Sequence, residues 1–290
     1  MNKGKIKNYL LDHKLAYFLL FPIILSRRFF LSFRRKSSIR IFDKFLSRIV
    51  EGTVFLNIPE YSGMFTIDIR SHIFRRIALF NEYETGIRDL VLTHLDRSRD
   101  AIDVGANIGL FTVLMAKQLS SGRRVLAIEP TSGASTLLRK NLLVNDVSSS
   151  VELYQGAAGN ENMKVDICIP QGREEYASIG RELVHESIAG YPIVKEQVKC
   201  NTLDYLVAKH DLVPGLIKID VEGAEYFVLD GAKETLKRFR PVVIFESSQA
   251  LMKNFPYTFS DIEELFITNH YSVYSLWETD EFLAIPIIDQ

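Results

Sequence analysis

The chain has 290 residues, of which 47% are hydrophobic and 24% are charged. This composition is ordinary for a globular protein and excludes wholesale disorder, and the length suits one large α/β domain with an extension, or two small domains. The net charge of -1 hides an asymmetry, because residues 1–48 carry 12 basic and two acidic residues while the remainder has a net charge of -11. An acidic body without a basic-aromatic platform in its loops excludes nucleic acid as an expected partner.

The cysteine content indicates a reducing compartment. Cys168 and Cys200 are the only cysteines, and the sequence has no CxxC or HExxH motif and no close group of histidines. Two thiols in a chain of this length form neither a disulfide framework nor a zinc motif. We therefore expect a cytoplasmic protein.

Residues 1–48 form a basic, apolar arm. Its apolar run, residues 15–25, has 11 residues and includes Pro22, whereas a helix that spans a bilayer needs about 20. Arginines follow the run where a signal peptide would have small residues. Basic residues on both sides and interleaved phenylalanines favour a helix on an anionic membrane surface, peripheral on the inner face. The alternative is an arm packed on the protein's own body or on a second copy in a homo-oligomer.

A lead-in segment, residues 49–95, follows the arm. Short apolar alternations between turn residues predict a small hairpin over about 50–73. Helical spacing of Ile87, Leu90, Val91 and Leu95 predicts a helix over about 84–95. The polar turn "DRSRD" then marks the start of the main domain, residues 96–290.

In the main domain the apolar period alternates between that of strands and that of helices, which predicts right-handed βαβ units and a parallel sheet. We expect one continuous helix over 224–238, and a capping box of Ser260 and Glu263 at the start of a later helix. Residues 159–201 interrupt the alternation as an insert. They hold two predicted strands, 163–170 and 193–200, separated by a polar stretch too long for a plain loop.

A glycine turn joins the first strand of the main domain to its helix. "DVGANIG" places Gly105 and Gly109 in the turn, with Asp103 before them and Asn107 between them. An acid at this position opposes the pyrophosphate of a dinucleotide but suits a ligand with an ammonium group. Glu129, at the end of the second strand, can accept hydrogen bonds from a ribose diol. These features favour S-adenosylmethionine as the cofactor, the alternative being a tight turn with an incidental acid.

The segment "DVGANIG" and, further along the chain, the segment "LIKIDVEGAEYFVLDGA" resemble the FkbM family of S-adenosylmethionine-dependent O-methyltransferases. The resemblance covers about residues 79–276. The resemblance implies a class I methyltransferase (Rossmann-like) α/β fold, with a seven-stranded, mostly parallel sheet, a reversed last strand and helices on both faces. The basic N-terminal extension has no counterpart in it. The resemblance also implies methyl transfer to hydroxyl groups of sugars, polyketides and related metabolites.

The resemblance assigns cofactor roles to matching positions. Asp103, Gly105, Asn107 and Gly109 correspond to the cofactor turn and Glu129 to the ribose acid. Ala157 stands where backbone groups meet the adenine. Glu84, in the pair "YE", is expected to reach the ammonium group, or else to be an acid favoured at a helix N-terminus.

The fourth strand of the main domain ends in charges. Ligands of open α/β sheets bind beyond the carboxyl ends of the strands, where the strand order switches, so Asp220 is expected to face the transferred methyl group. Either Asp220 or Glu222 accepts the hydroxyl proton, or these two and Glu246 hold a divalent cation. We favour the carboxylate base without a metal. Lys218 is expected to pair with a carboxylate, in a catalytic or purely structural role.

Three further side chains receive minor assignments. Glu225, one turn into the following helix, is expected to be a dipole or salt-bridge partner. His185 and Ser178, in the insert, are candidates for acceptor binding, although such residues in polar loops are more often only solvated.

The sequence therefore predicts an S-adenosylmethionine-dependent O-methyltransferase that acts on a hydroxyl, and we expect this hydroxyl to belong to a sugar in a glycan, glycolipid or related metabolite. Two alternatives stay open at this point. One is a nicotinamide-dependent oxidoreductase that uses the same turn, and the other is a non-catalytic, membrane-associated scaffold.

Overall fold

The computed structural model describes residues 52–171, 173–179, 192–276 and 279–287. The described residues divide into two compact units, one of residues 52–56 with 66–84, and one of residues 57–65 with the described residues from 85 onward. The basic arm and His185 lie outside the described residues. In the part of the chain that the structure describes, no helix has the length and apolar character needed to cross a membrane.

The lead-in segment contains the predicted hairpin and one helix that the sequence did not reveal. β1 (Thr53–Ile58) and β2 (Gly63–Asp68) form a two-stranded sheet and are joined by the short helix η1 (Pro59–Tyr61). The unforeseen helix is α5 (His72–Phe80), whose N-terminus is capped by the Ser71 side chain. It ends at Asn81, which has a left-handed backbone with φ of 61°. α6 (Thr85–His94) matches the helix predicted over 84–95.

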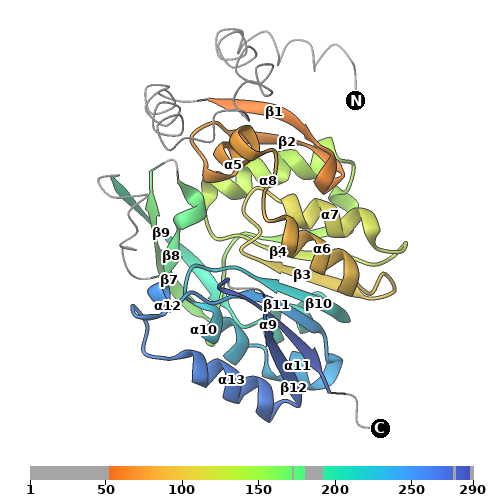
Figure 1. The fold of residues 1–290 in the computed structure, drawn as a ribbon, viewed down its shortest axis with the longest axis vertical. Coiled ribbons are helices and arrows are strands. Elements are labelled where there is room, and N and C mark those ends of the chain that lie inside the picture. The colour runs from red at the N-terminus through yellow and green to blue at the C-terminus, as the bar shows by residue number, and fades with distance from the viewer. Residues whose placement is uncertain (1–51, 172, 180–191, 277–278, 288–290) are drawn as a thin grey trace. The chain divides into compact units, whose positions relative to one another are not determined.

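The main domain is built on a seven-stranded sheet (Figure 1). In spatial order its strands are β12 (Tyr271–Ser275), β13 (Glu281–Pro286), β11 (Val242–Glu246), β10 (Pro214–Ile219), β3 (Asp100–Val104), β4 (Val125–Ile128) and β5 (Val151–Tyr154). β13 is antiparallel to β11 and to β12, and the pairs from β11 to β5 are parallel. The predicted sheet with a reversed last strand is therefore confirmed. The strand order switches between β3 and β10, whose carboxyl ends lie side by side.

Helices cover both faces of this sheet (Figure 1). One face carries α6, α7 (Leu110–Gln118) and α8 (Ser132–Val144), and the other carries α9 (Leu203–Lys209), α10 (Glu225–Asp230), α11 (Lys233–Phe239) and α13 (Phe259–Thr268). The short elements η2 (Ser148–Ser150) and α12 (Gln249–Met252) complete the set. The side chains of β10 alternate between the two faces. Ile217 and Ile219 join the apolar core shared with α9 to α13, whereas Lys218 lies over the ring of Phe111 on α7.

Two predictions of helix boundaries were wrong. The continuous helix expected over 224–238 is broken between α10 and α11, where the Gly231 carbonyl oxygen accepts a hydrogen bond from the Asp204 backbone N–H and the Asp204 carboxylate accepts from the backbone N–H groups at the start of α11. A Cβ atom at Gly231 would lie 2.0 Å from the carbonyl oxygen of Gly159. The capping box of α13 is formed by Thr258 and Asp261 rather than by Ser260 and Glu263. The helix starts earlier and includes Phe259, whose ring contacts that of Phe282.

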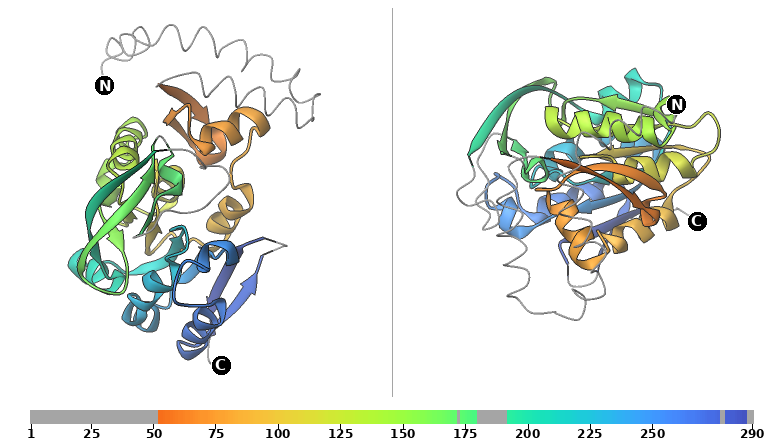
Figure 2. Two further views of the ribbon diagram at one scale, coloured as in Figure 1. Left: turned by 90° about the vertical axis from the view of Figure 1, so that its left-hand side faces the viewer. Right: turned by 90° about the horizontal axis from the view of Figure 1, so that it is seen from above.

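The described part of the insert forms a four-stranded sheet together with β6 (Ala157–Ala158), which comes just before it, and this sheet is green in Figure 2. Its strands, in spatial order, are β6, β9 (Ile193–Asn201), β7 (Met163–Pro170) and β8 (Ser178–Ile179), with the short helix η3 (Glu174–Tyr176) before β8. The two predicted strands are confirmed as β7 and β9, and β6 and β8 are additional. Ala157 belongs to β6 and pairs with Cys200. A small apolar core of four residues holds the sheet together: Ala157, Ile167, Ile169 and Cys200.

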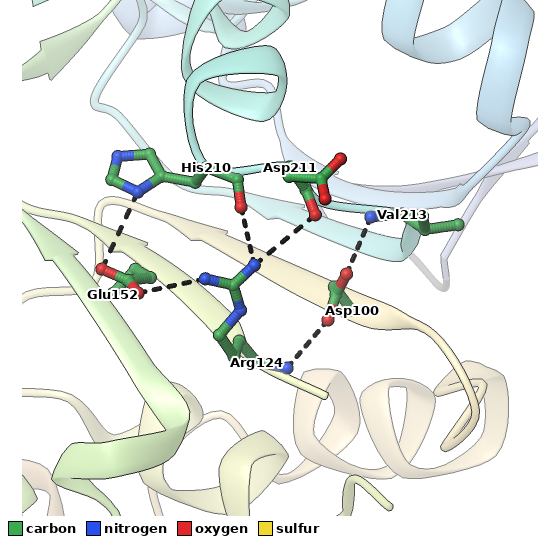
Figure 3. A network of polar contacts seen from close by, with 6 residues as sticks. All are labelled: Asp100, Arg124, Glu152, His210, Asp211 and Val213. Carbon is green, nitrogen blue, oxygen red and sulfur yellow. Dashed lines mark hydrogen bonds and ion pairs between the residues drawn. The ribbon is translucent and has the colours of Figure 1, made fainter. Parts of the chain in front are cut away.

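A polar network joins the amino ends of the central strands, at the edge opposite to the strand ends considered below (Figure 3). The buried carboxylate of Asp100 accepts hydrogen bonds from the backbone N–H groups of Arg124, at 2.8 Å, and Val213, at 2.7 Å. The Arg124 guanidinium donates to the His210 carbonyl oxygen and pairs with Glu152 at 3.1 Å. Burial lowers the pKa of His210. Each of these groups has a partner within the network, so we assign the network a structural role.

Candidate functional site

The glycine turn is shaped by contacts within the protein. Gly105 and Gly109 have φ angles of 80° and 89°, a region that disfavours side chains. A Cβ atom at Gly105 would lie 1.8 Å from the carbonyl oxygen of Asp220, and one at Gly109 would lie 2.2 Å from Leu138 Cδ1. Glycine is thus required because the end of β3 packs on the end of β10, and the start of α7 packs on α8.

Asp103 is the last but one residue of β3 and is only 1% exposed. Its Oδ2 accepts a hydrogen bond of 2.6 Å from the Thr112 hydroxyl on α7. Its Oδ1 is buried and has no hydrogen-bond partner among the described residues. Burial raises the pKa of Asp103, while Lys218 and Thr112 act in the opposite direction. A buried acceptor without a donor costs free energy, so this oxygen suits a donor supplied by a ligand.

Glu129 follows β4 and is held by three hydrogen bonds. Its Oε2 accepts from the backbone N–H of Asn107 in the glycine turn, at 2.8 Å. Its Oε1 accepts from the backbone N–H and the hydroxyl of Thr131, at 2.9 and 2.8 Å. Burial raises the pKa of Glu129 to about 7. The structure therefore joins the predicted residues Asn107 and Glu129, and adds Thr131, which the sequence did not single out.

The end of β10 brings three predicted residues together. Lys218 is 4% exposed and is paired in register with Asp103 on β3. Its ammonium group donates to Asp220 Oδ2 at 3.1 Å. The Asp220 side chain is 27% exposed, so it is the accessible member of the group. The expected pairing of Lys218 with a carboxylate is thus observed, with Asp220 as the partner.

The turn after β10 is organised by a buried acid. Glu222 and Gly223 have φ angles of 55° and 99°. Glu225 Oε1 accepts hydrogen bonds from the backbone N–H groups of Gly223 and Val221, at 3.0 and 3.3 Å, and burial raises the pKa of Glu225 to about 7. Glu225 is the first residue of α10, a position that fits the expected interaction of an acid with the helix dipole, and its hydrogen bonds also fix this turn. The Tyr257 hydroxyl supports the same turn by donating to the Gly223 carbonyl oxygen.

Two more acids lie at this edge of the sheet. Glu246 ends β11 and is directly opposite Glu281 of β13. Sequence reasoning did not single out Glu281, because only the antiparallel pairing brings it to the carboxyl ends of the other strands. Its pKa is raised, chiefly by burial and also by Asp220. Within residues 52–171, 173–179, 192–276 and 279–287, no three or more His, Cys, Asp or Glu side chains are arranged to hold a metal ion.

The remaining candidates are more distant from this group in the chain. Glu84 ends the first unit, just before α6, with φ of 40°, and its part in cofactor binding stays a prediction. Ser178 is buried in β8, in register with Cys168.

Comparison with known proteins identifies related sequences. The family model of the methyltransferase FkbM domain matches residues 103–274. Methyltransferase sdnD of Sordaria araneosa is 29% identical over 158 residues, which cover 46% of this chain and 60% of that protein. Methyltransferase 1 of Beauveria bassiana is 29% identical over 143 residues, covering 45% and 57% respectively. The chain thus spans less than two thirds of the length of these curated relatives.

Solved structures include similar chains. Methyltransferase FkbM from Methylobacillus flagellatus KT has 18% identity and a TM-score of 0.45, with coverage of 73% of this chain and 52% of that one. The O-methyltransferase from Bacillus cereus in complex with SAH has 18% identity and a TM-score of 0.42, with coverage of 68% and 77%. The family model spans more than half of the chain, from Asp103 near the end of β3 to β12, and on this match the protein belongs to the FkbM methyltransferase family.

Proposed function

We propose that this protein transfers a methyl group from S-adenosylmethionine to a hydroxyl group of a sugar, in a glycan, glycolipid or related metabolite. The observation that carries the cofactor assignment is the buried Oδ1 of Asp103, which has no hydrogen-bond partner among the described residues. An ammonium donor satisfies it, and the amino acid end of S-adenosylmethionine supplies one. Membership of a methyltransferase family supports the same assignment.

The remaining cofactor contacts follow from the same edge of the sheet. Glu129 keeps acceptor capacity beyond its three hydrogen bonds, since a carboxylate has about four lone-pair sites, and it would accept from the ribose hydroxyls. Ala157 comes shortly after β5, the third strand of the main sheet along the chain, and would border the adenine. When bound, the cofactor supplies an electrophilic methyl group on a sulfonium.

The chain's own residues would prepare the acceptor. Asp220 lies at the switch in strand order and is the accessible carboxylate beside the buried Lys218. It would accept the hydroxyl proton as the oxygen attacks, a contribution of roughly 10²- to 10⁴-fold. Lys218 holds Asp220 in position through the 3.1 Å hydrogen bond. Because an alcohol is a poor nucleophile, a positioned carboxylate favours O-methylation.

Calorimetric titration with S-adenosylhomocysteine, the demethylated cofactor, tests this proposal. We expect saturable binding to the full chain, and a loss of about tenfold or more in Asp103→Asn, since a hydrogen bond to a charged group contributes about 1.5–3 kcal/mol. Asp166→Asn, an exposed position on β7, is the matched control and should bind like the wild type. Binding of NAD without binding of S-adenosylhomocysteine would refute the proposal.

The acceptor class needs its own experiment. Incubation of the protein and labelled S-adenosylmethionine with cell extract, followed by separation into lipid, glycan, small-molecule, protein and nucleic-acid fractions, should place the label in the lipid, glycan or small-molecule fraction. Label confined to protein or nucleic acid would contradict the proposed acceptor.

A further inference from the structure

The sheet of the insert is hydrogen-bonded to the segment that follows Glu129, the proposed ribose acid. Glu196 lies on β9, and its Oε2 accepts a hydrogen bond of 3.0 Å from the backbone N–H of Ser132. Its Oε1 accepts a second hydrogen bond, of 2.6 Å, from the Ser132 hydroxyl. Ser132 is the first residue of α8, so one carboxylate of the insert holds both donors of this residue.

A second acid of the insert packs at the same place. A Cβ atom at Gly133 would lie 2.3 Å from Oε1 of Glu174, which belongs to η3. Carboxylates are favoured near a helix N-terminus because of the helix dipole. The insert therefore places two acids, from two of its elements, against the first turn of α8.

This turn is directly connected to Glu129. Thr131, the N-cap of α8, donates both its backbone N–H and its hydroxyl to Glu129 Oε1. Glu129 in turn accepts from the backbone N–H of Asn107 in the glycine turn. A continuous series of hydrogen bonds and adjacent residues thus runs from the insert, through Ser132 and Thr131, to the ribose acid and the turn after β3.

The carboxyl end of β9 is hydrogen-bonded to the last residue of β5 and to the segment that follows β5. The Tyr154 hydroxyl donates to Asn201 Oδ1 at 2.7 Å, and the Gly159 N–H donates to the Asn201 carbonyl oxygen at 3.1 Å. β9 therefore contacts both segments that are expected to surround the adenosine part of the cofactor, one after β4 and one after β5.

We propose that Glu196 is a positioning residue for the cofactor's ribose. It fixes Ser132 and thereby the Thr131 donors that orient the Glu129 carboxylate, so the insert determines how well that carboxylate meets the ribose diol. Glu196 itself touches no part of the cofactor. This inference rests on the proposed function, since it takes S-adenosylmethionine as the ligand.

The experiment compares two ligands by calorimetry on the full chain, S-adenosylhomocysteine and its analogue that lacks both ribose hydroxyls. In the wild type the analogue should bind about tenfold more weakly or worse, because hydrogen bonds to a charged carboxylate are lost. In Glu196→Ala the ratio of the two dissociation constants should fall to about threefold or less. Glu196→Gln keeps one acceptor oxygen and should give an intermediate ratio.

Glu161→Ala is the matched control, because it makes the same substitution at an exposed position of the insert and should keep the wild-type ratio. A wild-type ratio in Glu196→Ala, even with weaker binding of both ligands, would overturn the inference, since a general loss of structure weakens both ligands alike. If Glu196→Ala does not fold, the ratio in Glu196→Gln decides. A wild type that binds neither ligand refutes the proposed function as well.

Discussion

Glu129 is buried, and its proposed role in binding the cofactor's ribose would require the charged carboxylate. Its pKa is raised to about 7, and hydroxyl donors favour the ionised carboxylate, so cofactor binding should lower that pKa and release a proton. The affinity for the cofactor should therefore be highest above about pH 7. It should fall as the pH drops, because the carboxyl group becomes protonated in the free protein.

We therefore expect the dissociation constant of S-adenosylhomocysteine to increase by up to about tenfold per pH unit below about pH 7. Calorimetry over a pH series measures this slope, which should be reduced in Glu129→Gln. Glu281→Gln is the control, because burial also raises the pKa of Glu281 but that residue lies on the far side of β11. An unchanged slope in Glu129→Gln would contradict the assignment.

The choice between Asp220 and Glu222 as the base is also made at the residue scale. Asp220 is positioned by Lys218, whereas Glu222 belongs to the turn beyond the strand. We expect Asp220→Asn to lower the methylation rate by about 10²-fold or more, measured with labelled cofactor and the acceptor fraction. Binding of S-adenosylhomocysteine should be unchanged, and Glu222→Gln should retain activity to within about tenfold. The reverse order of the two variants would make Glu222 the base.

At the scale of elements, the close approach of β3 and β10 determines what can stand in the turn between β3 and α7. Gly105→Ala must accommodate both a left-handed backbone and a Cβ atom at 1.8 Å from the Asp220 carbonyl oxygen. We expect a loss of at least about 2 kcal/mol in the free energy of unfolding, measured with urea.

Gly122→Ala provides the matched control for this loss. Gly122 has a similar φ of 82°, but a Cβ atom there would meet nothing within 4 Å. Its substitution should cost only the backbone strain of about 1–2 kcal/mol. Equal losses in the two variants would show that the contact with Asp220 is unimportant.

At the scale of the whole molecule, the arm and the rest of the chain have net charges of opposite sign. Residues 1–48 have a net charge of +10 and the rest of the chain has -11. Recruitment to lipid-linked sugars on an anionic membrane is therefore a proposal that stands on sequence alone, because the arm lies outside the described residues.

Sedimentation with vesicles tests the arm in the full chain. Binding to vesicles that contain phosphatidylserine should be lost when Arg27, Arg28, Arg34, Arg35 and Lys36 are replaced by Gln, since each basic residue contributes about 1 kcal/mol near such a surface. Neutral phosphatidylcholine vesicles serve as the control. Equal binding of the wild type and the substituted variant to anionic vesicles would exclude an electrostatic role for these residues.

Much of the fold was predictable because it depends on short-range patterns. The alternation of strand and helix periods predicted the parallel sheet, and the segments "DVGANIG" and "KIDVEGAE" carried the resemblance to the FkbM family, which the match to residues 103–274 confirms. The nicotinamide and scaffold alternatives gain no support from that match. The cofactor and catalytic residues stay predictions, although Asp103, Lys218 and Asp220 do lie together as strands β3 and β10 require.

What the sequence by itself determined is therefore the family, the alternation of strands and helices in the main domain, and the residue types at the strand ends, since these depend on local periodicity and motif spacing. Only the tertiary structure decided which groups meet: Thr112 with Asp103, Thr131 with Glu129, Glu281 with Glu246, and Glu196 with Ser132. Ser132 and Glu196 are 64 residues apart. Such contacts depend on strand register and on the folding of the insert against α8, and no local pattern of residues encodes either of them.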